Sequence, residues 1–416
     1  MNKVIGQHLH FYQPRRNDFY TKKINEECYK PLAESGVFKH ISFNVGPTLI
    51  DWLHKNDKRT LDLIVKSDEG QAIAQPYSHR LLPLANDYDV ETQIIWGKKH
   101  FEKYFKREPK GMWLPETATS KRVLKKLAEQ GIEYTIGGFN QNKTNNKTDK
   151  VFEIDLDGEK IRYFFFNEIS PKLAFNSSRE KNGGFYLDNV EQTLYELKEK
   201  EDGFILLSYD GETFGHHKPF ADRWQAYFPE GVEKVDGLDL MLINKLNGEF
   251  TMEGEVHENS SWSCLCGGLK RWTAGCGCAG AEKGYKEQLF EIARMQEHTV
   301  HDIFETEGKK VLKNPWSARN DYIDLILKTR KWEDFVKEHF VVKTGEAQEK
   351  VKELLEAEYY TQLSMTSCGW FFENIHPQTR NNIEDLRTAA EHVRRGTGLD
   401  ISGNVKKVEW MLNHVS

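Results

Sequence analysis

The feature that most constrains the fold is an alternation of short apolar runs with amphipathic stretches through the first half of the chain. The apolar runs, which predict strands, cover residues 4–6, 41–45, 71–75, 111–114, 132–136 and 204–209. The stretches that predict helices between them include residues 47–55, 91–105 and 121–130. Strands that alternate with helices in this way are typical of a parallel sheet. The sequence therefore predicts a parallel α/β fold.

Polar side chains gather at or just after these apolar runs, where each strand is expected to end. They are His8, His10, Asn44, Gln75, His79, Glu116 and Asp210. In parallel α/β folds the carboxyl ends of the strands meet at one rim, and active sites lie there. The pattern therefore predicts an active site at the rim of a barrel-type sheet, although polar residues that only cap the following helices would give a similar pattern.

Two of these residues are carboxylates that end an apolar run abruptly. Glu116 closes the segment Gly-Met-Trp-Leu-Pro-Glu, and Asp210 lies in Leu-Leu-Ser-Tyr-Asp-Gly-Glu. Cleavage of a glycosidic bond needs two carboxyl groups, one that attacks or stabilises the anomeric carbon and one that protonates the leaving oxygen. Glu116 and Asp210 are therefore the candidate catalytic pair.

Two parts of the chain depart from the alternation of predicted strands and helices. Residues 151–166 contain two apolar runs around Asp157-Gly158, which predicts a hairpin that decorates the barrel. From about Ala281 the chain consists of long charged stretches that predict helices over 281–304, 320–339, 346–367 and 378–393. We therefore expect a catalytic barrel over residues 1–280 and a helical C-terminal domain over 281–416, packed on the barrel.

Composition limits the class of partner. The 416 residues have a formal net charge of −6, which argues against a nucleic-acid or anionic-membrane partner. No run of 18 apolar residues predicts a membrane span, and the N-terminus has no apolar run of signal-peptide length. We expect a cytoplasmic protein whose six cysteines are reduced or metal-bound. Aromatic residues make up 12% of the chain, which suits both sugar stacking and a large core.

Four segments together resemble glycoside hydrolase family 57, whose members act on α-glucans. They are His8-Leu-His-Phe-Tyr-Gln-Pro14, Phe43-Asn-Val-Gly-Pro-Thr-Leu49, Trp113-Leu-Pro-Glu116 and Tyr209-Asp-Gly-Glu-Thr-Phe-Gly-His216. The resemblance spans roughly residues 1–300, with a helical tail of a matching kind. The chain departs from the family at Tyr12, which stands where the first motif usually has histidine before Gln13-Pro14.

The resemblance implies an incomplete (β/α)7 barrel and a retaining double-displacement reaction of amylase or 4-α-glucanotransferase type that requires no catalytic metal. It assigns the nucleophile to Glu116 and the general acid/base to Asp210. A retaining reaction needs the two carboxyl groups about 5 Å apart. The expected substrate is an α-glucan or maltooligosaccharide. Candidate substrate-binding or orienting residues are His8, His10, Gln13, His79, Trp113, Glu212, His216, Trp262, Arg271 and Trp272.

A cysteine-rich segment follows the expected strands. Its four cysteines are Cys264, Cys266, Cys276 and Cys278. Four thiolates suit tetrahedral zinc, although Cys-x-x-Cys spacing is commoner than the Cys-x-Cys found here. The alternatives are a disulfide pair or four free thiols. A structural zinc ion is therefore one hypothesis for this segment.

Two further functional hypotheses remain at this stage. In the first, His8, His10 and Asp210 with His216 or His217 bind zinc, as in metal-dependent α-mannosidases or polysaccharide deacetylases. In the second, the barrel binds glycans without catalysis, which the presence of both candidate carboxylates disfavours.

Overall fold

The computed structural model describes residues 2–15, 18–144, 148–175, 189–199, 203–246, 251–264, 266, 268–277 and 285–414. The chain separates into two compact units. The first, here called the strand unit, comprises Met1–Gln75 and Tyr104–Trp262, and the second, the helical unit, comprises Pro76–Lys103 and Ser263–Ser416. No helix in the described residues is long and apolar enough to cross a membrane.

This division differs from the expected boundary at residue 280 in two places. Residues 263–280 belong to the helical unit, and so does the insertion Pro76–Lys103. The insertion joins the helical unit because Tyr77 and Trp96 are buried in one apolar cluster with Phe304. An amphipathic pattern shows that a helix has an apolar face but not which partner covers it.

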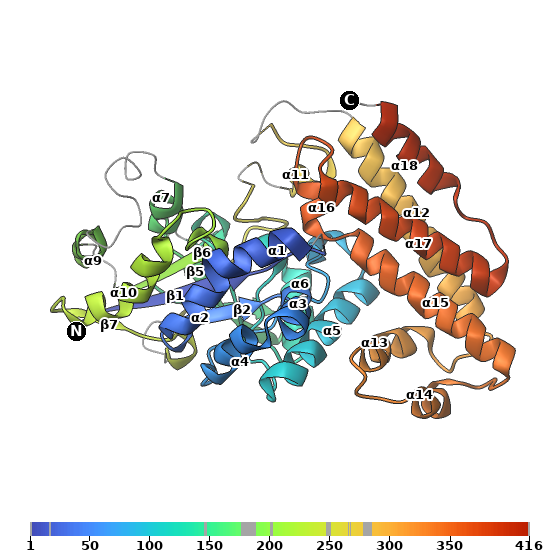
Figure 1. The fold of residues 1–416 in the computed structure, drawn as a ribbon, viewed down its shortest axis with the longest axis horizontal. Helices are drawn as coiled ribbons and strands as arrows, with labels where there is room; N and C mark the ends of the chain where they lie inside the picture. The colour runs from blue at the N-terminus through green and yellow to red at the C-terminus, as the bar shows by residue number, and fades with distance from the viewer. Residues whose placement is uncertain are drawn as a thin grey trace. The chain divides into compact units, whose positions relative to one another are not determined.

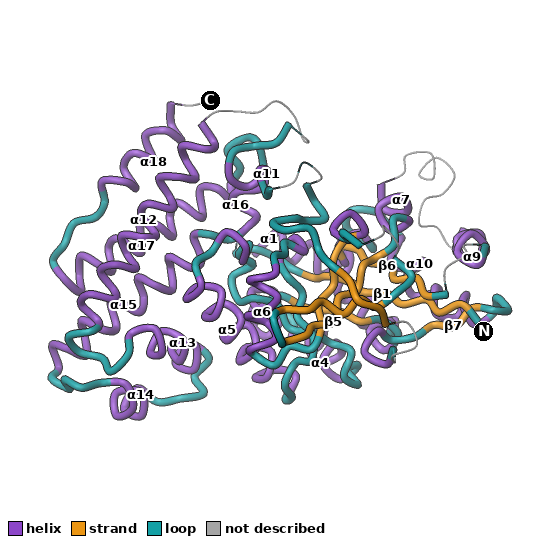
Figure 2. The backbone as a smooth tube through the Cα atoms, turned by 180° about the vertical axis from the view of Figure 1, so that it is seen from behind, coloured by secondary structure: helices purple, strands orange, loops and turns teal. Residues whose placement is uncertain are grey.

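The strand unit contains a parallel sheet in which β1 (Lys3–Phe11) lies between β2 (Ser42–Val45) and β6 (Phe204–Asp210). A short strand, β7 (Leu238–Leu240), also pairs with β1 in parallel. Figure 2 shows these strands in orange, flanked by helices. The parallel α/β prediction is therefore confirmed for this part of the chain.

A second sheet has the order β3-β5-β4-β8. Its strands are β3 (Tyr134–Gly138), β4 (Val151–Leu156), β5 (Glu159–Phe166) and β8 (Thr251–Gly254). The predicted hairpin is present, since β4 and β5 pair antiparallel around Asp157 and Gly158, which both have positive φ. However, β5 also pairs in parallel with β3, so the hairpin is part of the sheet rather than an added decoration.

The expected strands at 71–75 and 111–114 appear as single parallel bridges. Ala72 pairs with Phe43 of β2, Ala74 pairs with Met112, and Gly111 pairs with Tyr134 of β3. These bridges run between the two sheets in strand order. Within the described residues the strands nevertheless form two separate sheets, and no closed barrel is found.

Helices of the strand unit follow the expected pattern of apolar faces and capping signals. In α6 (Lys121–Glu129), the Ser120 side chain caps the N-terminus, while Val123, Leu124 and Leu127 are buried. The other α-helices in the described part of this unit are α1 (Asp18–Ile24), α2 (Lys30–Ser35), α3 (Pro47–Asn56), α4 (Lys58–Lys66), α7 (Ile169–Phe175), α9 (Val190–Lys198) and α10 (Ala221–Glu233).

In the helical unit, α12 (Tyr285–Gly308), α15 (Gly345–Ser364), α17 (Pro377–Thr397) and α18 (Gly403–His414) run side by side (Figure 1). The unit also contains most of α5 (Asp87–Phe105), with α11 (Lys270–Thr273) and α16 (Ser367–Phe371). The single helix expected over 320–339 is wrong. It is two helices, α13 (Pro315–Ile326) and α14 (Trp332–His339), separated by a turn in which Lys328 has a φ of 57°.

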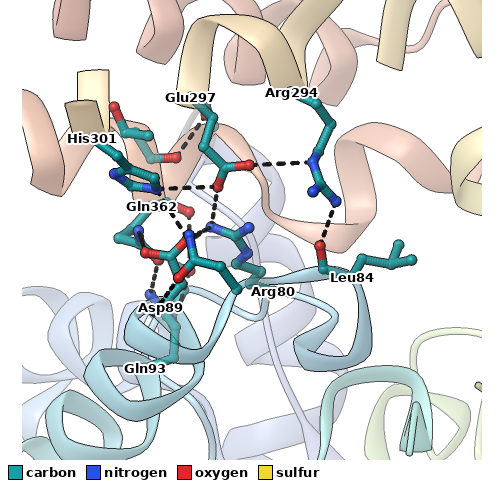
Figure 3. Close-up of polar contacts among 12 residues, drawn as sticks. Arg80, Leu84, Asp89, Gln93, Arg294, Glu297, His301 and Gln362 are labelled. Atoms are coloured by element: carbon teal, nitrogen blue, oxygen red, sulfur yellow. Dashed lines mark hydrogen bonds and ion pairs between the residues drawn. The ribbon is translucent and has the colours of Figure 1, made fainter. Parts of the chain in front are cut away.

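Six charged side chains are buried together inside the helical unit, and Figure 3 shows part of this network. Its members are Arg80, Asp89, Glu297, His301, Arg319 and Glu358. Burial alone would lower the pKa of His301, but the carboxylates of Asp89 and Glu358 outweigh it and raise the pKa well above its usual value. A protonated His301 with two arginines balances three carboxylates, so the network is neutral without a bound cation.

Candidate active site

The register of β1 with its two neighbours aligns polar residues in rows across the sheet. His10 pairs with Asn44 of β2 on one side and with Asp210 of β6 on the other. One pleat earlier, His8 pairs with Ser42 and Ser208 in the same way. Because residues two apart in a strand share a face, these rows lie on the same side of the sheet. The sequence prediction that these side chains gather near the ends of parallel strands is therefore correct for β1, β2 and β6.

Both β1 histidines are buried and hydrogen-bonded to Asn44. His8 Nε2 lies 3.1 Å from Asn44 Oδ1, and Asn44 Nδ2 lies 3.0 Å from His10 Nδ1. The same amide nitrogen donates to Gln75 Oε1 at 2.8 Å. Burial lowers the pKa of His8 and of His10 to about 3, so both rings are neutral at pH 7.

Trp113 forms the neighbouring wall of the site. Its fully buried ring stacks on His8 and His10, with centroids 5.0 and 4.8 Å apart. Trp262 packs edge-on against Trp113 at 5.1 Å and is only partly buried. Trp113, His8 and His10 are therefore buried, while Trp262 retains exposed surface.

Glu116 lies a few residues after Trp113, in the short helix η4 (Pro115–Thr117), and the backbone of this helix is strained. Glu116 and Thr117 both have left-handed φ, at 56° and 49°. A non-glycine residue in this region costs about 1–3 kcal/mol and persists only where its surroundings hold it, often at functional sites. Here Ser261 Oγ donates to the Glu116 carbonyl at 2.8 Å, and the Trp262 amide donates to Thr117 Oγ1 at 2.9 Å.

The carboxylate of Glu116 has a specific donor. Trp262 Nε1 lies 3.3 Å from Glu116 Oε2. The same tryptophan thus holds both the backbone and the side chain of the strained segment. Sequence reasoning named Trp262 as a sugar contact but missed its hydrogen bond to Glu116, because the two residues are far apart in the chain.

Asp210 ends β6 and retains access to solvent. Desolvation, followed by the negative charges of Glu212 and Glu116, raises the pKa of Asp210 well above its usual range. The side chain reaches solvent, which limits desolvation, so the two neighbouring carboxylates are the main cause of this shift. Asp210 therefore favours the protonated form while Glu116 lies within electrostatic range.

Gly211 comes next, where a Cβ atom would lie 2.1 Å from the buried ring of Phe11, so only glycine fits.

Glu212, in η7 (Gly211–Thr213), is buried and held by three donors. The Tyr29 hydroxyl donates to Glu212 Oε1 at 2.6 Å, and Gln13 Nε2 and the Tyr12 amide donate to it at 3.3 Å. Burial raises the pKa of Glu212 in spite of these hydrogen bonds. Glu212 acts on Asp210 through its charge, and Tyr29 is a residue of the site that no local sequence signal identified.

The other expected site residues lie in different surroundings. His216 Nδ1 lies 2.6 Å from Glu27 Oε2, so its partner is Glu27. His79 belongs to the helical unit, where its Nδ1 lies 2.8 Å from Ser367 Oγ. Trp272 is fully buried in the helical unit, against Phe371. Its expected role as a sugar-binding surface is corrected to one in the core, because no face of the ring is open.

Arg271 is also in the helical unit, largely buried, with its guanidinium over the Phe371 ring at 4.5 Å. Three of the four cysteines of the adjacent segment, Cys264, Cys266 and Cys276, lie together, and Cys278 lies outside the described residues.

The metal-dependent hypothesis requires His8, His10 and Asp210 to converge with His216 or His217. Among the described residues, the groups with metal-ligand geometry are Cys264-Cys266-Cys276, Asp89-His301-Glu358 and Asp321-Glu338-His339. None of these groups contains His8, His10 or Asp210. The site instead brings Asp210 into electrostatic range of two carboxylates.

Comparison with known proteins gives a family for the first part of the chain. The model for "Glycosyl hydrolase family 57" matches residues 5–257, and a "Domain of unknown function (DUF3536)" matches residues 293–403. The chain is 30% identical over 258 residues to "Alpha-amylase 1" of Dictyoglomus thermophilum, a match that covers 58% of this chain and 36% of the relative. It is 23% identical over 300 residues to a "4-alpha-glucanotransferase" of Thermococcus litoralis, covering 63% of this chain and 42% of the relative.

Solved structures share the fold. The exo-type maltose-forming amylase from Pyrococcus sp. ST04 aligns with a TM-score of 0.74 at 15% identity, covering 98% of this chain and 83% of that one. The branching enzyme from Pyrococcus horikoshii aligns with a TM-score of 0.65 at 16% identity, covering 99% and 95%. By contrast, the match with the first curated relatives spans less than half of their length.

Proposed function

Because the chain belongs to glycosyl hydrolase family 57, we propose that it is a retaining glycoside hydrolase or transglycosylase acting on α-glucans. The names of its curated relatives, alpha-amylase and 4-alpha-glucanotransferase, support this substrate class. Its substrate is an α-glucan or maltooligosaccharide, and the reaction itself needs no metal ion, since two carboxyl groups supply both proton transfer and covalent attack.

The observation that carries the proposal is the environment of Asp210. Its carboxyl group stands in the same row as His10 and within electrostatic range of Glu116 and Glu212. Two carboxyl groups with different protonation are what a double displacement requires, because one must donate a proton while the other attacks as an anion. Desolvation and neighbouring negative charge favour the protonated form at Asp210.

The reaction follows from these two roles. Asp210 gives its proton to the glycosidic oxygen as the bond from that oxygen to the anomeric carbon breaks. A Glu116 carboxylate oxygen bonds to the same carbon and forms a covalent glycosyl-enzyme. Asp210, now ionised, then takes a proton from water or from a sugar hydroxyl, whose oxygen displaces Glu116 and restores the original configuration.

We also propose that the strand unit closes as an incomplete (β/α)7 barrel. Support comes from seven segments in consecutive parallel order, joined by ladders or single bridges: β6, β1, β2, 72–74, 111–112, β3 and β5. The Asn167 amide, just after β5, donates to the Leu206 carbonyl of β6 at 2.7 Å. This hydrogen bond joins the two ends of the series.

The test is the product profile from maltoheptaose, measured by chromatography with mass detection. Products both longer and shorter than the substrate would establish an α-1,4-glucan transferase, and shorter products alone would establish a hydrolase of amylase type. If maltoheptaose is unchanged, the assignment to α-1,4-glucans is wrong, and the same assay with other α-glucan linkages follows.

The pH profile should respond to Glu212. Activity needs protonated Asp210, so the rate falls as the pH rises through its raised pKa. Glu212→Gln removes one of the negative charges that raise this pKa, so the basic limb of the kcat/KM profile should move to lower pH. The matched control is Glu129→Gln, an exposed residue at the end of α6. If the basic limb of the Glu212→Gln profile stays at the wild-type pH, the charge of Glu212 does not raise the pKa of Asp210.

Trp262→Phe should lower kcat while largely preserving the ring packing. The variant loses the indole N–H that donates to Glu116. A hydrogen bond to a charged group contributes about 1.5–3 kcal/mol. The donor orients Glu116 for attack, and its 3.3 Å length favours the low end, so we expect kcat to fall by at most about tenfold. Trp410→Phe, at an exposed tryptophan of α18, is the control. A raised KM with unchanged kcat would instead assign Trp262 to substrate stacking.

A further inference from the structure

Three thiols converge in the helical unit, outside the residues that the proposed reaction uses. The sulfur atoms of Cys264, Cys266 and Cys276 all lie within 4.8 Å of one another. Cys264 is buried, Cys276 is partly buried and Cys266 is exposed. They come from both sides of α11, two from the segment before it and one from the segment after it.

The distances suit a single tetrahedral ion. A Zn–S bond of about 2.3 Å places the sulfur atoms of a tetrahedral site about 3.8 Å apart. Thiols already within 4.8 Å of one another therefore need only a small closure to bind one ion. Soft thiolate ligands select zinc over calcium or magnesium, which prefer oxygen.

The backbone on the far side of α11 is shaped to present Cys276. Gly275 and Gly277 flank it with φ of 87° and 69°, a conformation that side chains rarely adopt. A Cβ atom at Gly275 would also lie 2.7 Å from Glu373 Oε2. The positive φ is what requires glycine on the N-terminal side of Cys276, since the Glu373 side chain is flexible and can move away from an added Cβ atom.

The charges around the thiols fit a site that becomes anionic. The Lys286 ammonium lies within electrostatic range of Cys264 and Cys276. Its Nζ also donates to the carbonyl oxygens of Arg271, in α11, and Phe371, in α16. Three thiolates around Zn²⁺ carry a net charge of −1. Lys286 and Arg271 supply two positive charges beside them and Glu373 one negative charge, while Lys286 also links α11 to α16.

We propose that Cys264, Cys266 and Cys276 bind one Zn²⁺ ion, which crosslinks the segments on either side of α11. The three thiolates fill three positions of the tetrahedron, and a ligand outside this set completes it. The ion holds α11 in place, with Trp272 and Arg271 packed on Phe371. This inference does not depend on the proposed glucan activity, since none of these residues belongs to the catalytic pair.

The test is metal content. The full chain, expressed with zinc in the medium, purified under reducing conditions and desalted, should contain about one zinc per chain by plasma mass spectrometry. Cys264→Ser and Cys276→Ser should lose the zinc, while Cys368→Ser, at a cysteine in α16 outside the cluster, should retain it. Cys266→His should also retain zinc, because imidazole is a zinc ligand and serine is not.

Two further readouts separate metal loss from misfolding. Reconstitution of the metal-free wild-type chain with Co²⁺ should give the visible absorption of tetrahedral cobalt thiolate, and Cys266→His should preserve a shifted form of it. A chelator should lower the Tm of the wild type and of Cys368→Ser but not that of Cys276→Ser. Wild-type protein without zinc, zinc retained in both Cys264→Ser and Cys276→Ser, bound iron, or a disulfide within the cluster by intact mass would each overturn the proposal.

Discussion

Glu116→Gln is expected to abolish turnover of maltooligosaccharides while it leaves binding intact. The amide has nearly the shape of the carboxylate, and its oxygen can still accept from Trp262 Nε1. However, it is not nucleophilic enough to form the glycosyl-enzyme. Removal of a covalent nucleophile typically costs about 10⁴–10⁶ in kcat, so we expect a loss of at least about 10⁴-fold. Steady-state kinetics and calorimetric titration with maltoheptaose measure the two effects separately.

The matched control for this variant is Glu129→Gln, which makes the same change on the exposed end of α6. It should keep wild-type activity. Chemical rescue identifies the role more closely: with an activated substrate and azide, Glu116→Ala should yield a glycosyl azide of configuration opposite to the substrate. A rescued product of the same configuration, or full activity in Glu116→Gln, would remove Glu116 from the nucleophile role.

The second large effect is expected on stability, from Arg319→Met in the helical unit. Arg319 is fully buried, and its Nη1 atom lies 2.8 Å from Asp89 Oδ1 and 2.6 Å from Glu358 Oε2. Methionine fills much of the volume of the arginine side chain, but it removes the positive charge that pairs with the Asp89 and Glu358 carboxylates. Breaking a buried pair from one side costs about 3–5 kcal/mol, so the free energy of unfolding should fall by about that amount. Denaturant titration by circular dichroism measures it.

The control is Arg387→Met, at an exposed arginine that pairs with Glu409. Exposed ion pairs contribute about 0–1 kcal/mol, so this variant should be nearly as stable as the wild type. The double variant Arg319→Met/Glu358→Leu should recover part of the loss, because it removes a stranded charge as well. Equal losses for Arg319→Met and Arg387→Met would show that the buried network contributes no more than a surface pair.

The sequence predicted a strand, helix or turn best where the pattern within that one segment was enough to identify it. Short apolar runs located β1, β2, β3 and β6, and Asp157-Gly158 located the hairpin. The apolar periodicity and Ser120 cap located α6. These predictions succeed because strand alternation, helix periodicity and turn chemistry act between residues only a few positions apart.

The same local reading failed where a distant partner decides the outcome. The turn at Lys328 divides a stretch that the pattern predicts as one helix, and the 76–103 insertion belongs with helices nearly 200 residues later. In the buried charge network only Glu297 and His301 have a local spacing, four residues apart on α12, and the other partners come from distant segments. In the site, Tyr29 contacts Glu212 and Trp262 contacts Glu116, although the two residues of each pair are far apart in the sequence.

The sequence by itself determined which residue types stand at the ends of the parallel strands, and hence that Glu116 and Asp210 are the candidate acids. Only the tertiary structure decided their environment. The parallel register sets Asp210 beside His10, Trp262 holds Glu116, and Glu212 adds a negative charge near Asp210. The physical reason is that protonation state and orientation depend on desolvation, charge and hydrogen bonds through space, which arise only when distant segments pack together.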